Sequence, residues 1–295
     1  MYQEKKLSQK LLVFSTFALI PLFAFFAVVI LPFITGILMT VTTWTGLSGS
    51  LFEFVGFKNF INTFNDAAFW GSFGSTMKYV AYTLVITNVL AFGLALLVTQ
   101  GFKGQNFFKL GYFTPNLIGG IILGFVWQFI FTRAIVQVGQ ILEWDIISTS
   151  WLADPKKALW ALVIVTVWQN TGYMMLIYIA GLTGLDQSVL EASLIDGANW
   201  VKQLFKIKIP LLVPSFTISL FLTLQRSFLI YDTNLSLTEG GPYRSTEMIA
   251  MHIYNEAFTY QNFGEGQAKA IILFVVVAAI AVTQVTIMNK MEVES

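Results

Sequence analysis

The sequence predicts an all-α integral membrane protein with six membrane-spanning helices. Of its 295 residues, 56% are hydrophobic and only 11% are charged, whereas about a quarter of the residues of an average soluble domain are charged. Apolar runs of about 20 residues, the length at which a helix crosses the hydrocarbon core, recur along the chain. The six runs lie near residues 11–39, 77–98, 107–131, 158–182, 209–230 and 268–288.

Prolines fall inside three of these runs. Because proline has no backbone N–H and its ring crowds the preceding turn, each position predicts a kink, and kinked spans can rock. The prolines are Pro21 and Pro32 in the first run, Pro115 in the third, and Pro210 and Pro214 in the fifth. The sequence Gly119-Gly120-x-x-x-Gly124 follows Pro115, and we interpret these glycines as close helix-packing positions rather than a hinge.

Lysines predict which way the chain crosses the membrane. The first run follows three lysines, as a signal peptide would, but it is too long and lacks a small-residue cleavage site, so we expect a span. Six spans place both termini on one side, and the positive-inside rule makes that side cytoplasmic. The inner segments then hold Lys5, Lys6, Lys10, Lys103, Lys109, Lys202, Lys206, Lys208 and Lys290, while the outer segments are richer in acids.

This topology divides the chain into three regions. Residues 1–71 are expected to hold a cytoplasmic segment, the first span and an outer loop. Residues 72–288 form a core of five spans, and residues 289–295 form a cytoplasmic tail. No linker, low-complexity tract or tandem repeat interrupts the core.

A charged segment stands between the fourth and fifth apolar runs. Ser188 followed by Glu191 is a capping-box pattern that predicts the start of a short helix. Gly197 should end this helix, and Trp200 begins a second apolar stripe. A solvated loop helix would explain the pattern as well as a contact site does.

The spacing of this segment resembles a known family. Glu191 to Ala198 reads E-A-S-x-x-D-G-A and is followed by I-x-I-P-x-x-x-P, a pattern similar to the cytoplasmic coupling loop of permease subunits of binding-protein-dependent ABC importers. The resemblance implies a type I ABC importer permease fold, with the first small helix docked on a cytoplasmic ATPase. Ile209 departs from the leucine usual in the family, a volume-conserving change. The residues implied in coupling are Glu191, Ala192, Ser193, Asp196, Gly197 and Ala198.

Two polar tracts lie inside apolar runs, at residues 168–173 and 225–227. They suggest a path for a substrate, because polar groups are costly in lipid and usually face a cavity. Amides and phenols recognise sugar hydroxyls, and aromatic rings stack on sugar C–H faces. Hydrogen bonding between helices is the alternative for each residue. The tracts resemble the sugar-lining segments of maltose-type and oligosaccharide permeases. The role is carried to Gln169, Asn170, Tyr173, Gln225 and Arg226, with Trp168 and Ser227 as weaker members.

Arg226 departs from the neutral amide that the family often has at its position. It either pairs with Asp232 or selects a substrate with acidic groups. The tract from Thr238 to Pro242 reads as a turn, since glycines tolerate positive φ. The resemblance assigns this outer loop to the face that meets an extracellular solute-binding protein.

Several classes of function are excluded or disfavoured. The formal net charge is +1 with dispersed basic residues, which gives no footprint for nucleic acid. There is no cysteine, so disulfides and thiol chemistry are excluded. The single His252 makes no catalytic or metal-binding set and is expected to be a surface or packing residue. No phosphate-binding G-x-x-x-x-G-K-[ST] sequence occurs, so the chain should not hydrolyse ATP by that route.

We therefore expect a permease subunit, not an enzyme, in a bacterial plasma membrane. The resemblance implies a second homologous permease, two ABC ATPases that bind ATP and magnesium, a solute-binding protein, an oligosaccharide and membrane lipid as partners; the chain itself should bind no cofactor. Importers of glycerol-phosphate or an acidic saccharide are the alternative within the class. A gradient-driven transporter would need a carboxylate or sodium site within the membrane, and a structural scaffold would not need the coupling segment.

Overall fold

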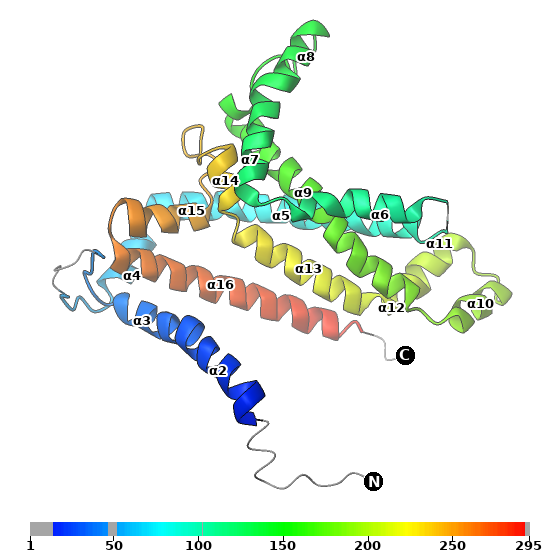
Figure 1. The fold of residues 1–295 in the computed structure, drawn as a ribbon, viewed down its shortest axis with the longest axis horizontal. Helices are drawn as coiled ribbons and strands as arrows, with labels where there is room; N and C mark the ends of the chain where they lie inside the picture. Colours follow the sequence, from blue (N-terminus) through cyan, green and yellow to red (C-terminus); the bar gives the residue numbers. More distant parts are fainter. Residues whose placement is uncertain (1–13, 47–51, 102, 293–295) are drawn as a thin grey trace. The chain divides into compact units, whose positions relative to one another are not determined.

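The computed structural model describes residues 14–46, 52–101 and 103–292, and these residues are helical apart from loops and one isolated bridge between Thr42 and Phe54 (Figure 1). The predictions for Lys5, Lys6 and Lys10 lie outside the described residues, as do residues 293–295 of the expected tail. The α-helices are α2 (Ile20–Phe25), α3 (Leu31–Met39), α4 (Lys58–Asn65), α5 (Ala67–Val98), α6 (Gln105–Phe113), α7 (Gly120–Phe129), α8 (Ile135–Ile141), α9 (Pro155–Thr183), α10 (Gln187–Ile195), α11 (Trp200–Gln203), α12 (Ile209–Leu211), α13 (Val213–Phe228), α14 (Asp232–Leu237), α15 (Ile249–Tyr254) and α16 (Phe263–Asn289). Short π and 3-10 turns are η1 (Ser15–Leu19), η2 (Phe26–Ile30), η3 (Thr114–Leu117), η4 (Ile130–Ala134), η5 (Trp151–Ala153), η6 (Leu204–Lys208) and η7 (Asn255–Thr259).

Helices of membrane-spanning length occur where most of the apolar runs lie. Within the described residues, five helices are long and apolar enough to cross a membrane, and a sixth span is obtained if the bent pair Trp200–Leu211 and Val213–Phe228 counts as one. The predicted runs 77–98 and 158–182 fall within α5 and α9, which extend further at their N-terminal ends. An all-helical membrane protein is therefore confirmed.

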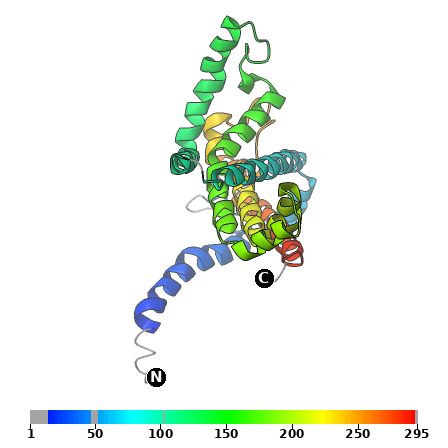
Figure 2. The same ribbon diagram turned by 90° about the vertical axis from the view of Figure 1, so that its right-hand side faces the viewer.

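The third predicted run, 107–131, is not one continuous helix. α6 ends at Phe113, η3 follows, and α7 begins only at Gly120 and continues through η4 and α8 to Ile141. Pro115 removes a donor, and Gly119 adopts extended backbone before α7. α6 lies along α5 and the C-terminal half of α9, whereas the stretch from α7 to α8 projects away from α5 and α6 (Figures 1 and 2). The apolar composition of the run was read correctly, but its continuity was not.

Prolines also shape the other interrupted spans. Three π-turns, η1, η2 and η6, stand directly before helical turns with proline at the second residue. The Leu31 N–H donates to the Phe26 carbonyl and the Ile209 N–H to the Leu204 carbonyl, each five residues back. After Pro210 the chain bends by 69° between Leu211 and Val213. The expected kink in the fifth run is therefore present as a bend, whereas the first run is one continuous helix over Ser15–Met39 that contains two π-turns, and a kink there stays a prediction.

The chain divides into two compact units. One comprises the described residues of Met1–Asp66 together with Ile253–Ile272, and the other Ala67–His252 together with Leu273–Ser295. These boundaries come from packing, and the three regions expected along the sequence remain a prediction.

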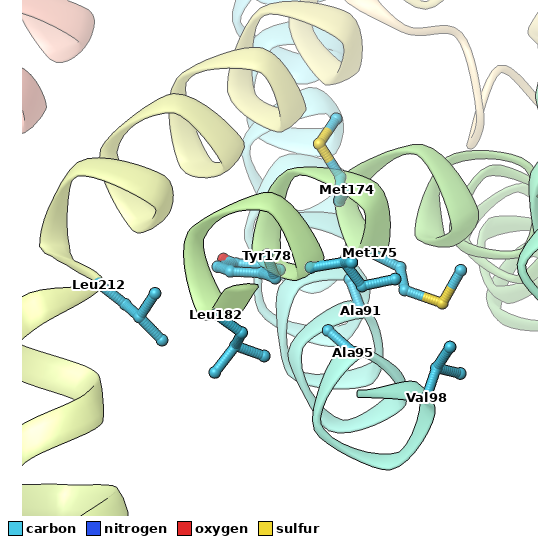
Figure 3. Packing of buried hydrophobic residues seen from close by; sticks show 9 residues of the cluster. Ala91, Ala95, Val98, Met174, Met175, Tyr178, Leu182 and Leu212 are labelled. Carbon is cyan, nitrogen blue, oxygen red and sulfur yellow. The ribbon is translucent and has the colours of Figure 1, made fainter. Parts of the chain in front are cut away.

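The larger unit is built around α5, α9 and α13, which pack against one another. Figure 3 shows part of the apolar core, where Ala91 and Ala95 of α5 face Met175 and Tyr178 of α9. The small alanines allow the two helices to approach closely. A polar cluster joins all three helices, because the Asn88 Oδ1 accepts from the Tyr178 hydroxyl at 2.8 Å and from the Ser219 hydroxyl at 2.6 Å.

Two glycine positions show how closely the helices of this unit pack. A Cβ added to Gly124 of α7 would lie 1.9 Å from the Ser236 Oγ of α14, and one added to Gly172 of α9 would lie 1.8 Å from the Tyr112 carbonyl oxygen of α6. Real Cβ atoms do not approach other atoms so closely. Gly124 therefore serves close packing, as predicted, and Gly172 holds α9 against the backbone of α6. The prediction was wrong for Gly119, which has open space around it and lies in extended backbone where the third run breaks.

The smaller unit contains a buried lysine that the sequence reading did not single out. The Lys269 side chain is fully buried, and its Nζ lies 2.8 Å from Asp66 Oδ2, 2.7 Å from Glu256 Oε2 and 3.2 Å from Glu265 Oε1. An ammonium group has three donors, so each carboxylate can accept one. The network ties the first turns of α16 to the segments before α5 and in η7.

Candidate functional site

One cavity of the larger unit gathers side chains from both polar tracts. It has a volume of about 490 Å³ and is lined by Gln169 and Asn170 of α9 and by Gln225 and Arg226 of α13. Four of the seven predicted substrate residues therefore meet in one place. A volume of several hundred cubic ångströms is typical of small-molecule sites.

Arg226 is held in a fixed position at this cavity. Its Nη1 donates to the Asn170 Oδ1 at 2.7 Å, and its guanidinium carbon lies 4.6 Å from the centre of the Tyr173 ring. The described residues include no ion pair between Arg226 and Asp232, although both line the cavity. Of the two roles considered for Arg226, pairing with Asp232 is not observed.

Gln169 supplies a hydrogen-bond donor to the backbone where the third run is broken. Its Nε2 donates to the Ile118 carbonyl at 3.0 Å, an acceptor next to the start of α7. Non-helical backbone at membrane depth is tolerated where protein groups satisfy it or where it lines a cavity. Gln225 is exposed, and its side chain has no hydrogen-bond partner within the described part of the chain, so its amide can contact a ligand.

Three predicted substrate residues do not line the cavity. Ser227 is buried, and its hydroxyl lies 2.9 Å from the Thr83 hydroxyl of α5. Trp168 packs edge-to-face on Trp127 at 5.5 Å between ring centroids, and Tyr173 reaches the site only through Arg226. Ser227 thus makes the helix-to-helix contact that was the alternative for each polar residue.

Other residues of the cavity were not among the predicted substrate residues, although Asp232 was considered as a possible partner of Arg226. Asn116 comes from η3, Thr166 from α9, and Asp232 and Thr233 from the start of α14. Asn116 directly follows Pro115, and a polar residue in a proline-broken apolar run was an available signal. Thr166 offered none, because a single threonine in a helix commonly bonds its own backbone.

The charged segment after α9 forms two short helices joined at Gly197, as expected. The predicted cap was wrong: Asp186, not Ser188, is the N-cap of α10, and its Oδ1 accepts from the Ser188 N–H at 2.8 Å. This bond holds the pKa of Asp186 below its ordinary value. Asp186 stands two residues earlier and offers a charged acceptor, so the helix begins before the serine.

The end of α10 is a Schellman motif. Gly197 has φ +75°, the Ala198 N–H donates to the Ser193 carbonyl at 2.9 Å, and the Gly197 N–H donates to the Leu194 carbonyl at 3.0 Å. Gln203 of α11 donates to the Ser193 hydroxyl at 2.9 Å and so fixes the two helices against each other. Ser193 is therefore buried, while the other residues of the predicted coupling set are exposed or partly exposed: Glu191, Ala192, Asp196, Gly197 and Ala198.

The same segment presents apolar side chains to its surroundings. Leu194 is 61% exposed and Ile195 87% exposed, and Trp200, Val201 and Phe205 are also exposed. Contiguous exposed apolar residues mark interaction sites.

The tract from Thr238 to Pro242 is a turn, as predicted. Gly240 has φ +78°, and the Gly241 N–H donates to the Thr238 carbonyl at 2.8 Å. Beside it, Arg244 and His252 contact the buried Glu247 carboxylate, with His252 Nδ1 at 3.5 Å from Oε1. Burial alone would raise the pKa of Glu247, but hydrogen bonds from His252 and Arg244 and the charge of Arg244 lower it to about 2. His252 is buried and is thus not a surface residue, and its role in packing stays a prediction.

Comparisons with known proteins agree with this geometry. No family model matches the sequence. The chain is 44% identical over 267 residues to a probable starch degradation products transport system permease protein, AmyD, of Thermoanaerobacterium thermosulfurigenes, covering 90% of each chain. It is 29% identical to MsmF, a multiple sugar-binding transport system permease protein of Streptococcus mutans, covering 94% of this chain and 96% of MsmF.

A solved structure shares the fold. A chain of a bacterial alginate ABC transporter, in complex with an alginate pentasaccharide-bound periplasmic protein, superposes with a TM-score of 0.80 over 94% of this chain and 93% of that one, at 16% identity. The agreement of fold, relatives and polar cavity establishes that the chain belongs to the permease subunits of sugar ABC transporters.

Proposed function

We propose that this chain is a transmembrane subunit of an ATP-driven importer for a disaccharide or oligosaccharide. The observation that carries the proposal is the cavity in which Gln169, Asn170, Gln225 and Arg226 meet beside a broken span. The amides can donate to and accept from the hydroxyl groups of a sugar, and the guanidinium can donate to them. The relatives named for starch degradation products and for multiple sugars support the same substrate class.

The α10–α11 pair is the proposed contact with an ATPase. Its exposed apolar residues Leu194 and Ile195 lie on a helix whose end is rigidly defined by Gly197 and by the Gln203 contact. A rigid helix with an apolar face suits docking into a groove of a partner. Movement of the ATPases can then reach α9 and α13, which flank this segment in the chain.

The proposed topology has six spans, both termini in the cytoplasm and α10 on the cytoplasmic side. A second homologous permease, two ATPases that bind ATP and magnesium, and an extracellular binding protein facing the Gly240 turn complete the transporter. ATP binding would draw the two coupling helices together and open the cavity outward, and hydrolysis would restore the inward-facing state. The family assignment favours this cycle over a gradient-driven transporter.

One observation favours a second substrate class. Arg226 carries a positive charge into the cavity without an ion pair to Asp232, and such a charge would suit an acidic saccharide or a glycerol-phosphate. The variant Arg226→Gln separates the two classes. If the natural substrate is acidic, the variant should take it up much more slowly and should gain uptake of a neutral oligosaccharide. If the natural substrate is neutral, its uptake should change only modestly.

Purification of the tagged chain in mild detergent from its native host tests the assembly. We expect a second, related permease and an ABC ATPase among the co-purifying chains identified by mass spectrometry. Isolation of the chain alone, under conditions that keep other membrane complexes intact, would contradict the proposal. The identity of an associated binding protein would direct the choice of sugars for uptake measurements.

A further inference from the structure

A second cavity of the larger unit lies at the other end of the spans, next to the α10–α11 pair. It has a volume of about 540 Å³ and is lined by residues from the C-terminal ends of α5 and α9, from α10 and α11, and from η6. None of the predicted substrate or coupling residues lines it. Its position, where α5 ends at Val98 and α9 at Thr183, is where two candidate spans leave the hydrocarbon.

The chemistry of the lining divides into an apolar and a polar part. Leu96, Leu182 and Leu190 supply apolar surface, while Gln100, Gln187 and Lys208 supply polar groups. Lys208 is half-buried and forms no ion pair with any residue that the structure describes. The side chains of Gln100 and Gln187 likewise have no hydrogen-bond partner within that part of the chain. The cavity thus offers a cation and two amides to a ligand that also has an apolar part.

We propose that this cavity binds the phosphate-ester headgroup of an anionic phospholipid, such as phosphatidylglycerol, from the cytoplasmic leaflet. The unpaired Lys208 matches a phosphate, the amides match its ester and glycerol oxygens, and the leucines supply apolar surface for the acyl part of the lipid. Basic pockets between membrane helices on the cytoplasmic side are suited to anionic headgroups. Trp200, which also lines the cavity and is 57% exposed, is a residue type enriched at the membrane interface.

A lipid in this position would connect the spans with the coupling segment. The cavity is bounded by α5 and α9 on one side and by α10 and α11 on the other, so a bound headgroup contacts both. It would therefore stabilise one orientation of α10 relative to the spans. The assignment of the leaflet rests on the proposed topology, whereas the binding itself does not.

The test measures lipid retention by the purified chain with native mass spectrometry. The chain is prepared with its co-purifying subunits in detergent containing phosphatidylglycerol or phosphatidylcholine. Lys208→Gln is compared with Lys206→Gln, which makes the same charge change at an exposed position of the same turn that does not line the cavity. We expect selective retention of phosphatidylglycerol that weakens about fivefold in Lys208→Gln, the contribution of one lysine to anionic lipid binding, and is unchanged in Lys206→Gln.

Equal retention by the two variants, or no preference for phosphatidylglycerol in the unmodified chain, would overturn the proposal. Inorganic phosphate and glycerol phosphate at millimolar concentration provide a further arm: displacement of the lipid by either would identify a soluble phosphate ester as the ligand and reject the lipid. Co-purification of the ATPase is scored in the same samples. Its absence would count against the proposed transport function and leave the lipid measurement interpretable.

Discussion

Substitution of Gly197 should uncouple the transporter through backbone conformation alone. The residue has φ +75°, and a Cβ placed on it meets no atom within 4 Å, so Gly197→Ala introduces no clash. It does place an L-residue in the left-handed region, at about 1–2 kcal/mol. Because the Ala198 and Leu194 hydrogen bonds of the Schellman motif depend on this conformation, the ratio of the native end of α10 to its alternatives falls by a factor of about 5 to 30.

The assay is sugar uptake in whole cells, normalised to the amount of permease in the membrane. Gly197→Ala should lower uptake by up to that factor without reducing insertion. Gly197→Asn should lower it less, since asparagine tolerates the left-handed region, and Gly197→Asp, which adds a charge where the ATPase is proposed to dock, should block transport. Gly111→Ala is the control, because Gly111 also has open space but not a positive φ. Normal uptake in Gly197→Ala and Gly197→Asp would refute the reasoning.

Three further predictions concern stability. Lys269→Met should destabilise the protein by about 3 kcal/mol, because it leaves three partly buried carboxylates without the buried cation between them. The exposed Lys58→Met should change stability by less than about 0.5 kcal/mol, and thermal unfolding in detergent compares the two variants. Gly172→Val should cost about 1–3 kcal/mol or more by forcing α9 from the Tyr112 carbonyl, and Gly93→Val, at a position with open space, is its control in the same assay. Glu247 has a folded-state pKa of about 2, below its ordinary 4.5. Its contribution to the free energy of unfolding is therefore complete above about pH 4.5 and is lost as the pH falls toward 2. Glu247→Gln should flatten the decline of the melting temperature in that interval, and an identical decline in both proteins would contradict the assignment.

The helical class, the proline breaks and the polar tracts could be predicted from the sequence, because each depends on local chemistry. Hydropathy located apolar residues, and Pro115 and Pro210 marked where backbone donors are missing. The glycine at 197 could be recognised because few other residues end a helix in the left-handed region. These features need no knowledge of what packs against them.

The direction of a side chain, and the choice between two neighbouring residues for the same role, could not be predicted from the sequence. Arg226 and Ser227 are adjacent, yet one faces Asn170 and the other faces Thr83, because successive helical residues differ by about 100°. The sequence did not say which face of α13 meets α5. Likewise, Asp186 and Ser188 are both good N-caps, and the choice between them is made by where the chain leaves α9.

The π-turns before the prolines have a consequence for how homologous chains should be aligned. Each accommodates one residue more than an ordinary helical turn, so residues beyond it are rotated by about 100° relative to an uninterrupted helix. A single helical-wheel projection of Ser15–Met39 therefore assigns the wrong face to one of its halves. A relative that lacks one residue between Phe26 and Ile30 could keep the same length of span to within 1.5 Å, yet it would present a different set of side chains to its neighbours beyond Pro32. In such a family, a gap of one residue inside a span indicates that the helix beyond the gap turns a different face to its neighbours. It is not an alignment error.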